Sequence, residues 1–532
     1  MSIQILGRSL IGFRDGARTG NVFRAVAPGS GTALAPEFHS ATVADTEATV
    51  KLAAEAFSVY GNLSGRAKGN FLRTVAMNLE AITDALVERA HQETALPTPR
   101  LQGEVARTCG QLRLFADLVE EGSWTAPRID RALPDRKPLP KPDLRSLLRP
   151  IGPVVVFGAS NFPLAFSVAG GDTASALAAG NPVVVKAHPA HPGASELAGR
   201  AIRTSVQDCG LPEGTFSLLF DSGNRVGAKL VQHPNIKAGA FTGSYAGGRA
   251  LFDLAMKREE PIPFFAEMAS TNPLFILPGA LAANTEKIAT GLFNSFTLGA
   301  GQFCTKPGLV FLPEGTTAEQ FAAQLQQKVS ASAEVTLLTA SIARSFASEA
   351  AARDNDPKFQ PVARGQSSGN SAAAAVAKLY EANLTNLLED PHIGSEHFGP
   401  STVLIRFQTK DQILECARRL SGHLTATIHG TPEDLVEYAE LVRILENKVG
   451  RLIFNGFPTG VEVTHAMVHG GPFPATSDSR TTSVGSLAIL RFARPVCYQD
   501  FPDSVLPAEL QTRNPLGLWR TVDGAITRDA LC

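Results

Sequence analysis

Apolar residues in the first third of the chain recur at steps of three and four, which is the period of an amphipathic helix. In residues 70–90, NFLRTVAMNLEAITDALVERA, this spacing puts one apolar stripe on one face and predicts a single helix. The stripe consists of Leu72, Val75, Leu79, Ile82 and Leu86. The same period predicts helices over 42–57 and 100–122, so the chain begins with a helical region.

Capping and proline residues mark where this helical region starts and ends. Thr42 and Asp45 have the spacing of a capping box, in which each side chain bonds the other residue's backbone N–H. The passage 126–150, APRIDRALPDRKPLPKPDLRSLLRP, has too many prolines for a helix interior and predicts an extended excursion or a hairpin arm.

From residue 151 the pattern changes to short β-branched runs separated by helical segments. GPVVVFGAS and NPVVVKA enclose an alanine-rich stretch within about thirty residues, which is the length of a βαβ unit and predicts parallel strands. A helix at 193–210 and strands in FSLLFD and AGAFTGS continue the alternation. We expect a doubly wound α/β sheet of the nucleotide-binding type.

A second α/β region follows over about 268–475, with strands predicted in PLFILP, LVFLP, STVLIRF and RLIFNG. The alanine-rich segment 370–382 looks helix-prone. The apolar segment 486–501, SLAILRFARPVCYQDF, predicts a terminal strand that suits a neighbouring subunit. An exposed strand edge is a liability in a monomer, so we expect a homodimer or homotetramer.

Composition limits the classes of function. A chain of 532 residues is too long to fold around one simple hydrophobic core, so we expect more than one domain. Its 49 basic and 50 acidic residues give a net charge of −1. This balance gives no electrostatic reason to bind nucleic acid or an anionic membrane. No run approaches the ~20 apolar residues of a membrane span, and MSIQILGRSLIGF lacks the features of a secretory signal. We therefore expect a cytoplasmic protein.

Cysteine and histidine spacing predicts no metal site. The six cysteines are scattered, with no C-x-x-C pair, which excludes a disulfide framework and a zinc signature of that kind. They are Cys109, Cys209, Cys304, Cys416, Cys497 and Cys532. His188 and His191 lie close together, but the sequence offers no third ligand near them.

Six short segments carry residues suited to chemistry. Cys304 stands in the glycine-rich bend GAGQFCTKPG, where backbone N–H groups can point at a thiolate and activate it. The other segments are GASNFP with Asn161, VVVKAHPAHP with Lys186 and His188, AFTGSYAGGRAL with Gly243, Ser244 and Gly248, FAEMASTNP with Glu267, and EHFGPS with Glu396 and Phe398.

In this order and spacing the segments resemble the aldehyde dehydrogenase superfamily over nearly the whole chain. The resemblance implies three parts: an NAD(P)-binding domain at 1–126 and 150–266, a catalytic domain at 267–478, and an oligomerisation element at 127–149 and 479–532. It also implies that Cys304 is the nucleophile, Asn161 stabilises the oxyanion and Glu267 is the base. Such a set oxidises an aldehyde through a thiohemiacetal and a thioester, which water then hydrolyses.

The resemblance also assigns the cofactor residues. Lys186 would bond the adenosine ribose, and the turn of Gly243, Ser244 and Gly248 would hold the pyrophosphate at a helix N-terminus. Glu396 would bind the nicotinamide ribose, with Phe398 beside the ring. Members that prefer NAD often carry a glutamate three residues after the lysine, where this chain has Pro189. With Lys186 and His188 nearby, NADP is the favoured cofactor and NAD the alternative.

Several motif variants are similar to one branch, that of α-ketoglutarate semialdehyde (2,5-dioxopentanoate) dehydrogenases and NADP-linked fatty aldehyde dehydrogenases. They are GAGQFCTKPG, MVHGGPFPATSDSRTTSVG and FARPVCYQDFP. The branch implies oxidation of 2,5-dioxopentanoate to 2-oxoglutarate, with Phe162, Phe303 and His469 as candidate substrate-pocket residues. The substrate carboxylate requires a cation near the tunnel mouth, and the sequence does not say which arginine or lysine supplies it.

Two departures from the wider family and three alternatives stay open. The usual Glu-Leu-Gly-Gly motif continues after Glu267 as Met-Ala-Ser, and an asparagine common five residues before the nucleophile is Gly299. A fatty aldehyde dehydrogenase would use the same chemistry with an apolar tunnel. Glu267 argues against transfer of the acyl group to coenzyme A, and Cys304 together with Glu267 argues against a non-catalytic binding protein.

Overall fold

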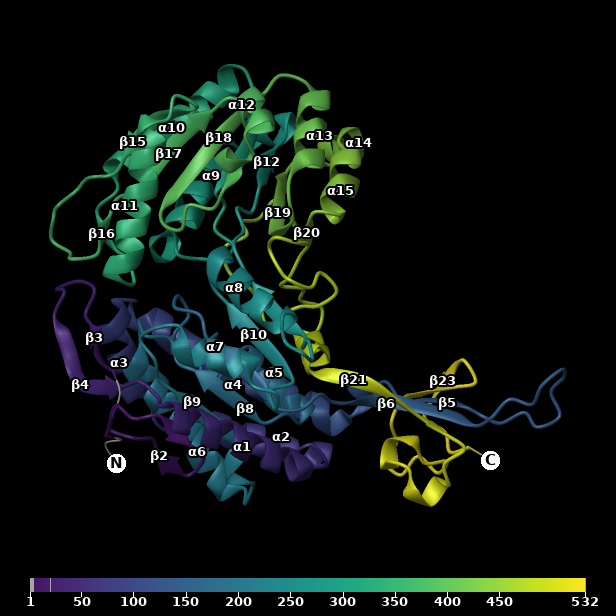
Figure 1. Cartoon of the computed structure of the whole chain (residues 1–532). Coiled ribbons are helices and arrows are strands. Elements are labelled where there is room, and N and C mark those ends of the chain that lie inside the picture. The colour runs from purple at the N-terminus through teal and green to yellow at the C-terminus, as the bar shows by residue number, and fades with distance from the viewer. Residues whose placement is uncertain (1–3, 20, 532) are drawn as a thin grey trace.

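A computed structural model describes residues 4–19 and 21–531, and it contains two seven-stranded sheets and a smaller five-stranded one. In Figure 1 the first sheet and its helices form the lower half, the second sheet forms the upper half, and a hairpin arm extends to the right. No helix within the described ranges is long and apolar enough to cross a membrane. The five cysteines in these ranges are free thiols, and Cys532 lies outside them.

The first sheet has the order β11-β10-β7-β8-β9-β1-β2, and its first five strands are parallel. Its strands are β1 (Leu10–Ile11), β2 (Arg14–Asp15), β7 (Val154–Phe157), β8 (Val183–Lys186), β9 (Phe216–Leu219), β10 (Ala238–Thr242) and β11 (Phe264–Glu267). Its helices are α1 (Val43–Tyr60), α2 (Gly65–Glu80), α3 (Thr83–Thr94), α4 (Thr98–Glu121), α5 (Asp172–Ala179), α6 (Pro192–Asp208), α7 (Arg225–Gln232) and α8 (Tyr245–Met256). The predicted βαβ unit is confirmed as β7-α5-β8.

Helices cover both faces of this sheet because successive strand residues point to opposite sides. Val154 and Val156 of β7 pack into a core shared with α2, α4, α5 and α6. Val155 and Phe157 pack into another core with α1, α7 and α8. The doubly wound sheet expected from the sequence is therefore confirmed.

The predicted helix over 70–90 is wrong in one respect, because it is two helices. α2 ends at Glu80 and α3 begins at Thr83, although the predicted capping box of Thr42 and Asp45 at the start of α1 is confirmed. Leu79 and Leu86 lie on either side of the break and enter the same core. The spacing of apolar residues indicates which residues are buried, but it does not show whether the helix is continuous. Two helices that pack on the same core can have the same spacing on both sides of a short break.

The second sheet has the order β15-β17-β18-β13-β12-β19-β20, parallel except for β15. Its strands are β12 (Leu274–Ile276), β13 (Leu309–Pro313), β15 (Phe359–Arg364), β17 (Lys378–Ala382), β18 (Ser401–Phe407), β19 (His423–His429) and β20 (Val449–Phe454). Its helices are α9 (Pro278–Thr297), α10 (Thr316–Ala331), α11 (Ala340–Asn355), α12 (Leu384–Glu389), α13 (Lys410–Arg419), α14 (Pro432–Glu437) and α15 (Ala439–Glu446). All four predicted strands are present.

The alanine-rich segment 370–382 is not helical. It contributes β16 (Ala374–Ala375), which pairs with β14 (Val335–Thr336), and then β17, which lies between β15 and β18. The intrinsic preference of alanine for helix is worth less than 1 kcal/mol per residue, so pairing on both edges of a buried strand outweighs it.

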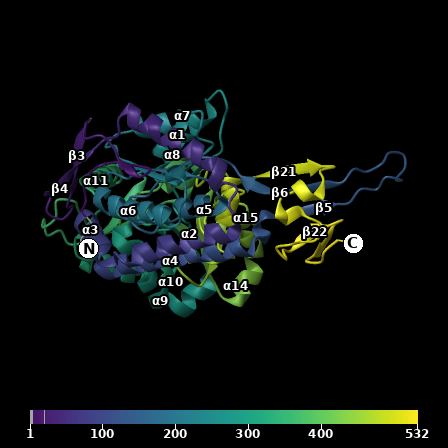
Figure 2. The ribbon, with the colours of Figure 1, turned by 90° about the horizontal axis from the view of Figure 1, so that it is seen from below.

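The predicted arm is confirmed as a hairpin that projects from the body in both views (Figures 1 and 2). Its sheet has the order β21-β6-β5-β22-β23, made of β5 (Arg128–Asp130), β6 (Leu144–Pro150), β21 (Ala493–Gln499), β22 (Arg520–Val522) and β23 (Ala525–Thr527). Residues 486–492 form a 3₁₀ helix, so the terminal strand begins only at Ala493 and pairs with β6 of the same chain.

The remaining elements are short. β3 (Val22–Val26) and β4 (Ala33–His39) form a separate hairpin. The 3₁₀ helices are η1 (Ser123–Thr125), η2 (Glu213–Thr215), η3 (Leu298–Gly301), η4 (Pro391–Gly394), η5 (Ser486–Phe492), η6 (Asp503–Val505) and η7 (Ala508–Leu510). Among them, η3 lies directly before Cys304 and positions it.

Candidate active site

The bend that carries Cys304 is built from residues with left-handed backbone. Gly299, Ala300 and Gly301 have φ angles of 56°, 59° and 67°. A Cβ atom on Gly301 would lie 2.3 Å from the backbone carbon of Gly399, so only glycine fits there. The chain therefore leaves α9 through a tight turn packed against the backbone at 399, and Cys304 follows in a fixed position.

Two side chains that the sequence did not single out hold this bend in place. Asn272 donates from Nδ2 to the carbonyl oxygens of Cys304 (2.8 Å) and Lys306 (3.0 Å). Lys306 is buried and donates from Nζ to the carbonyls of His397 (3.0 Å) and Ser401 (2.8 Å). These hydrogen bonds tie the Cys304 loop to the segment before β12 and to the start of β18.

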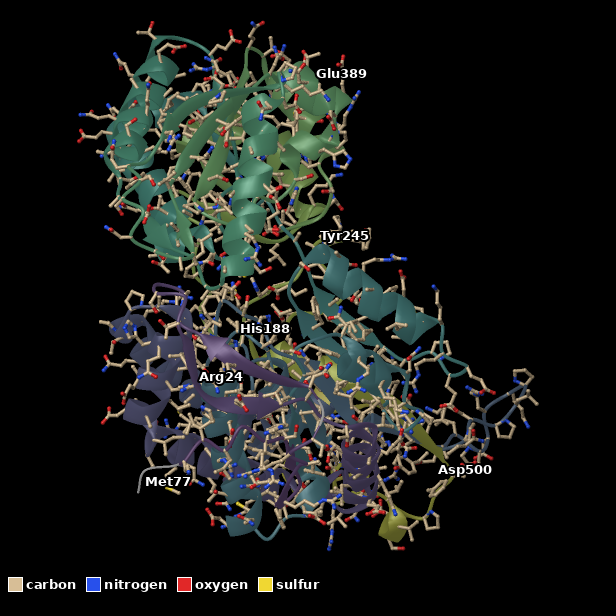
Figure 3. The ribbon with its side chains drawn as sticks, turned by 60° about the vertical axis from the view of Figure 1, so that its left-hand side comes forward. Arg24, Met77, His188, Tyr245, Glu389 and Asp500 are labelled. Carbon is tan, nitrogen blue, oxygen red and sulfur yellow. The ribbon has the colours of Figure 1, made fainter. Side chains whose placement is uncertain are left out.

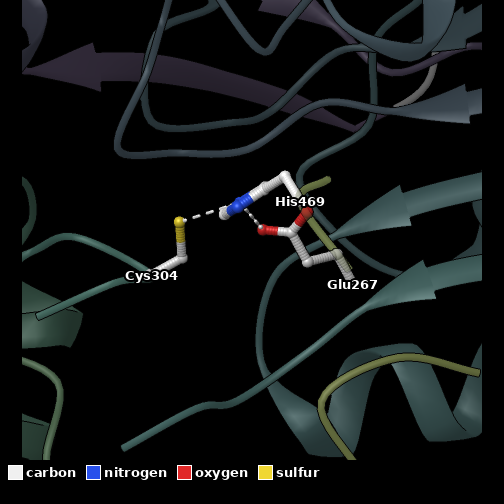
Figure 4. Close-up of side chains that lie close together, drawn as sticks. All are labelled: Glu267, Cys304 and His469. Atoms are coloured by element: carbon white, nitrogen blue, oxygen red, sulfur yellow. Dashed lines mark hydrogen bonds and ion pairs between the residues drawn. The ribbon is translucent and has the colours of Figure 1, made fainter. Parts of the chain in front are cut away.

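Cys304, His469 and Glu267 converge although they lie far apart in the sequence (Figure 4). The Nε2 atom of His469 lies 2.9 Å from Oε1 of Glu267 and 3.5 Å from Sγ of Cys304. Ser483 donates from Oγ to the other oxygen of Glu267 at 2.6 Å. An ionised carboxylate can only accept, so His469 holds its proton on Nε2 in this contact.

The loop that carries His469 reaches Glu267 through backbone pairing. Glu267 ends β11, and Met268 donates its backbone N–H to Ala475 at 2.8 Å. Ser483 donates its backbone N–H to the carbonyl of His469 at 2.8 Å, which folds the loop back on itself. The strand end and the loop therefore fix the carboxylate and the imidazole relative to each other.

The surroundings keep Glu267 ionised and Cys304 protonated at rest. Burial alone would raise the pKa of Glu267, but the charge and hydrogen bond of His469, the hydrogen bond of Ser483 and the charge of Arg491 together hold it below its usual value. Burial raises the pKa of Cys304 well above its usual value, and the charges of Glu267 and Glu396 add to this. The site thus has a proton acceptor beside a thiol that needs one.

The same three groups are the kinds that bind metals, and their ligating atoms lie within 4.8 Å of one another. The proton that His469 shares with Glu267 occupies the position a cation would take, and a metal on Sγ would compete with nucleophilic attack. Proton transfer fits this cluster better than metal binding.

Asn161 lies beside the bend that carries Cys304. It is buried and donates from Nδ2 to the carbonyl of Gln302 at 2.9 Å. An amide nitrogen carries two hydrogens, so one remains for an oxyanion. The backbone N–H of Cys304 has no carbonyl partner among the described residues, which leaves a second donor at the same place.

A pocket of about 370 Å³ opens beside the loop. Phe162 and Phe303 line it and pack edge to face, with ring centroids 5.2 Å apart. Its other lining residues are Pro97, Arg100, Gly103, Glu104, Arg107, Leu298 and Gly299. His469, which the sequence grouped with Phe162 and Phe303, is buried next to the thiol and does not line this pocket.

The residues expected to bind the adenosine half of a dinucleotide lie at the carboxyl edge of the first sheet. Lys186 ends β8 half-buried, and burial lowers its pKa to about 8. Burial also lowers the pKa of His188 well below its usual value, and its Nδ1 accepts from the backbone N–H of Ala190 at 3.1 Å. His188 is therefore neutral at pH 7 and adds no positive charge.

The glycine turn opens α8, as the sequence predicted. Ser244 is the N-cap and accepts the backbone N–H of Gly247 at 3.2 Å. Tyr245 lies at this end of α8, where the two halves of the molecule meet (Figures 1 and 3). A Cβ on Gly248 would lie 2.6 Å from Cγ of Met268, so this position needs glycine. The exposed first turn offers free N–H groups to a phosphate.

Glu396 and Phe398 come from the segment before β18 of the second sheet, whereas Lys186 ends β8 of the first sheet. Both are half-buried. Burial raises the pKa of Glu396, and the nearby ammonium of Lys306 acts against this rise. A carboxylate and an aromatic ring here are suited to a ribose and a flat ring. The residues present therefore fit a dinucleotide across the edges of the two sheets.

The fold places a cluster of cysteine, histidine and carboxylate side chains between two seven-stranded α/β sheets. The profile of the aldehyde dehydrogenase family matches residues 13–472, so the chain belongs to that family. It is an aldehyde-oxidising enzyme.

Named relatives cover almost the whole chain. It is 48% identical over 523 residues to alpha-ketoglutaric semialdehyde dehydrogenase 2 of Azospirillum brasilense, covering 98% of this chain and 99% of that protein. It is 46% identical over 493 residues to alpha-ketoglutaric semialdehyde dehydrogenase of Acinetobacter baylyi, covering 92% and 93%. Among solved structures, gamma-glutamyl-gamma-aminobutyraldehyde dehydrogenase of Burkholderia cenocepacia has the same fold, with a TM-score of 0.78 at 20% identity, covering 94% of this chain and 97% of that one.

Proposed function

We propose that this enzyme oxidises 2,5-dioxopentanoate to 2-oxoglutarate with NADP, through a thioester on Cys304. The observation that carries the proposal is the convergence of Cys304, His469 and Glu267 next to a pocket large enough for a small aldehyde. The names of two relatives at 46–48% identity support the substrate.

The first step is attack by sulfur. Cys304 gives its proton to the carboxylate of Glu267, whose oxygen lies within 4.8 Å of Sγ, and the thiolate adds to the aldehyde carbon. The carbonyl oxygen becomes an anion and takes hydrogen bonds from Nδ2 of Asn161 and the backbone N–H of Cys304. Removing one such donor typically costs ~10²–10³ in rate. His469 keeps Glu267 in place through Nε2.

The bound nicotinamide supplies the acceptor for the hydride that leaves the thiohemiacetal carbon. Lys186, the first turn of α8 and Glu396 would hold the dinucleotide. Glu267 then loses its proton to solvent and deprotonates the water that attacks the thioester, which releases the carboxylate and returns Cys304 to its thiol form. Because this base is present, hydrolysis is favoured over transfer to coenzyme A.

The charges near Lys186 support NADP rather than NAD. Pro189 replaces the carboxylate that would repel a 2′-phosphate, and Lys186 is the one cation of this turn, since His188 is neutral. Pro189→Glu should lower kcat/KM for NADP by about 100-fold relative to NAD, because like charges in contact cost several kcal/mol. An unchanged ratio would contradict this assignment.

The test of the substrate is a comparison of initial rates with 2,5-dioxopentanoate and a C6–C14 aldehyde series. A lead of at least ten-fold in kcat/KM for 2,5-dioxopentanoate, about 1.4 kcal/mol, would support the proposal. Rates that rise with chain length would replace it by a fatty aldehyde dehydrogenase with the same catalytic residues. Cys304→Ala should bind NADP and form no NADPH with either substrate.

A homodimer or homotetramer in the cytoplasm completes the proposal. β21 is at the edge of its sheet, and no described strand pairs with its outer side. Leu139 and Phe501 of the same module are 69% and 50% exposed, so the arm carries uncovered apolar surface beside an open edge. A stable monomer in sedimentation at micromolar concentration would contradict the oligomer.

A further inference from the structure

One wall of the pocket carries two arginines from the same helix. Arg100 and Arg107 are seven residues apart on α4, two turns along one face, and both line the pocket. The guanidinium of Arg100 lies 4.8 Å from the ring centroid of Phe303, and that of Arg107 lies 5.9 Å from that of Phe162. Cationic groups thus border an otherwise aromatic pocket.

These guanidinium groups have unused donors. Arg100 donates from Nε to Glu104 (3.3 Å) and from Nη2 to the carbonyl of Asn161 (2.6 Å), but its buried Nη1 has no acceptor among the described residues. Arg107 makes no hydrogen bond or ion pair within the described ranges, and its Nη2 is buried. Leaving buried donors unpaired is costly, so a ligand with acceptor oxygens would stabilise them.

Glu104 does not neutralise Arg107. Its Oε2 accepts the backbone N–H groups of Leu164 (3.2 Å) and Ala165 (3.3 Å), while Oε1 faces Arg100. Both oxygens of the Glu104 carboxylate therefore already have partners, which are the backbone after Asn161 and the side chain of Arg100. The charges of Glu104 and Glu462 act on Arg107 without forming an ion pair with it, and the pocket lining, with two arginines and one glutamate, has a net positive charge.

Gly299 packs directly against the Arg100 guanidinium at the edge of the pocket. A Cβ at this position would lie 2.6 Å from Nη1 of Arg100 and 2.6 Å from Cε2 of Phe303. The asparagine common at this position in the wider family would cover the guanidinium. The glycine at position 299 therefore allows the Arg100 guanidinium to take the position in which its Nη1 has no partner.

We propose that Arg107 and Arg100 bind the carboxylate and the adjacent 2-oxo oxygen of the substrate and make the pocket selective for short aldehydes that carry a 2-oxo acid. Arg107 makes the ionic contact because it has no anionic partner of its own, and Nη1 of Arg100 donates to the second oxygen. This inference rests on the proposed function and supplies the cation that the sequence left unassigned.

The test separates the anion site from the choice of substrate. Arg107→Gln and Arg107→Lys are compared with wild type, and Arg113→Gln, an exposed arginine on the same helix, is the matched control. One readout is the Ki of 2-oxoglutarate as a competitive inhibitor of pentanal oxidation. The other is the ratio of kcat/KM for 2,5-dioxopentanoate to that for pentanal, an aldehyde of the same length without the acid.

Arg107→Gln should raise the Ki and lower the ratio by about 100-fold, equivalent to about 2.7 kcal/mol. Arg107→Lys keeps the positive charge, so its Ki and its ratio should differ from those of wild type by only about ten-fold. Arg113→Gln should match wild type. If 2-oxoglutarate inhibits wild type and not Arg107→Gln while wild type shows no preference for 2,5-dioxopentanoate, the proposed substrate is wrong and the anion site stands. An unchanged Ki, or equal losses on both aldehydes in both Arg107 variants, would overturn the inference.

Discussion

Replacing Glu267 by glutamine separates the two halves of the reaction. Glutamine keeps the size of the side chain and one acceptor oxygen toward His469 (2.9 Å), but it removes the negative charge and the proton acceptor. Its amide nitrogen also cannot accept from Ser483, whose hydroxyl lies 2.6 Å from the carboxylate. The variant therefore tests the base with little change in packing.

The expected magnitude follows from the role of the base. General-base catalysis contributes ~10²–10⁴ in rate, which is about 2.7–5.4 kcal/mol, so steady-state turnover should fall by that factor. Hydride leaves before the thioester is hydrolysed, so the first turnover should still produce about one NADPH per active site, at a lower rate because Glu267 also accepts the proton of Cys304. Removing the Glu267 charge also favours the thiolate, because that charge adds to the burial that raises the pKa of Cys304.

The assay combines stopped-flow NADPH absorbance with intact-mass detection of the acylated enzyme. In parallel, the pH dependence of Cys304 alkylation by iodoacetamide reports the thiol. Because the thiolate is the reactive form, the alkylation rate rises with pH through the pKa of Cys304. The Glu267→Gln profile should be displaced to lower pH than that of wild type, so alkylation at pH 8 should be faster in the variant.

Ser483→Ala is the matched control, since it keeps the carboxylate and removes one hydrogen bond. Without that bond the pKa of Glu267 rises, so the acid limb of kcat should move to higher pH while the burst and the steady state stay coupled. Wild-type turnover in Glu267→Gln would refute its role as base. An alkylation profile displaced to higher pH would refute the electrostatic argument.

Two further predictions concern the framework of the site. Gly301→Ala should reduce kcat and lower the free energy of unfolding by about 1–3 kcal/mol, because its Cβ would lie 2.3 Å from the backbone of Gly399. Gly210→Ala is the control, since Gly210 has a similar φ of 62° but stands in open space, and it should affect kcat much less. Thermal melts and initial rates compare the two variants. Asp172→Asn should lower the free energy of unfolding by about 3–5 kcal/mol, because the buried guanidinium of Arg491, now 2.5 Å from the carboxylate, loses its ion-pair partner. An unchanged Tm by circular dichroism would contradict this.

Much of the fold could be read from the sequence because it depends on local patterns. The βαβ unit, the parallel strands, the capping box at Thr42 and the proline-rich arm each have a short-range signal, and all are present. Two errors came from the same reasoning. Apolar spacing did not show the break between α2 and α3, and alanine content predicted a helix at 370–382, where pairing with distant strands makes β17.

The sequence by itself determined which residue types were available for chemistry, since Cys304, Glu267 and Asn161 stand in short motifs with recognisable spacing. Only the tertiary structure decided how they are used. Ser483 stands in the same branch motif as His469, but nothing in the sequence pointed to its contact with Glu267, and His469 joins Glu267 only because that loop pairs with the end of β11.

The wall of the pocket also depends on tertiary structure. Arg100 and Arg107 read as ordinary polar positions of an amphipathic helix, and Gly299 as an unexplained departure. Folding brings the helix, the turn after β7 and the nucleophile loop together around one pocket. A catalytic motif can be found in a sequence because a single short segment carries it. Whether an arginine in a pocket is left without a partner depends on which distant segments fold against it and which hydrogen bonds their side chains make.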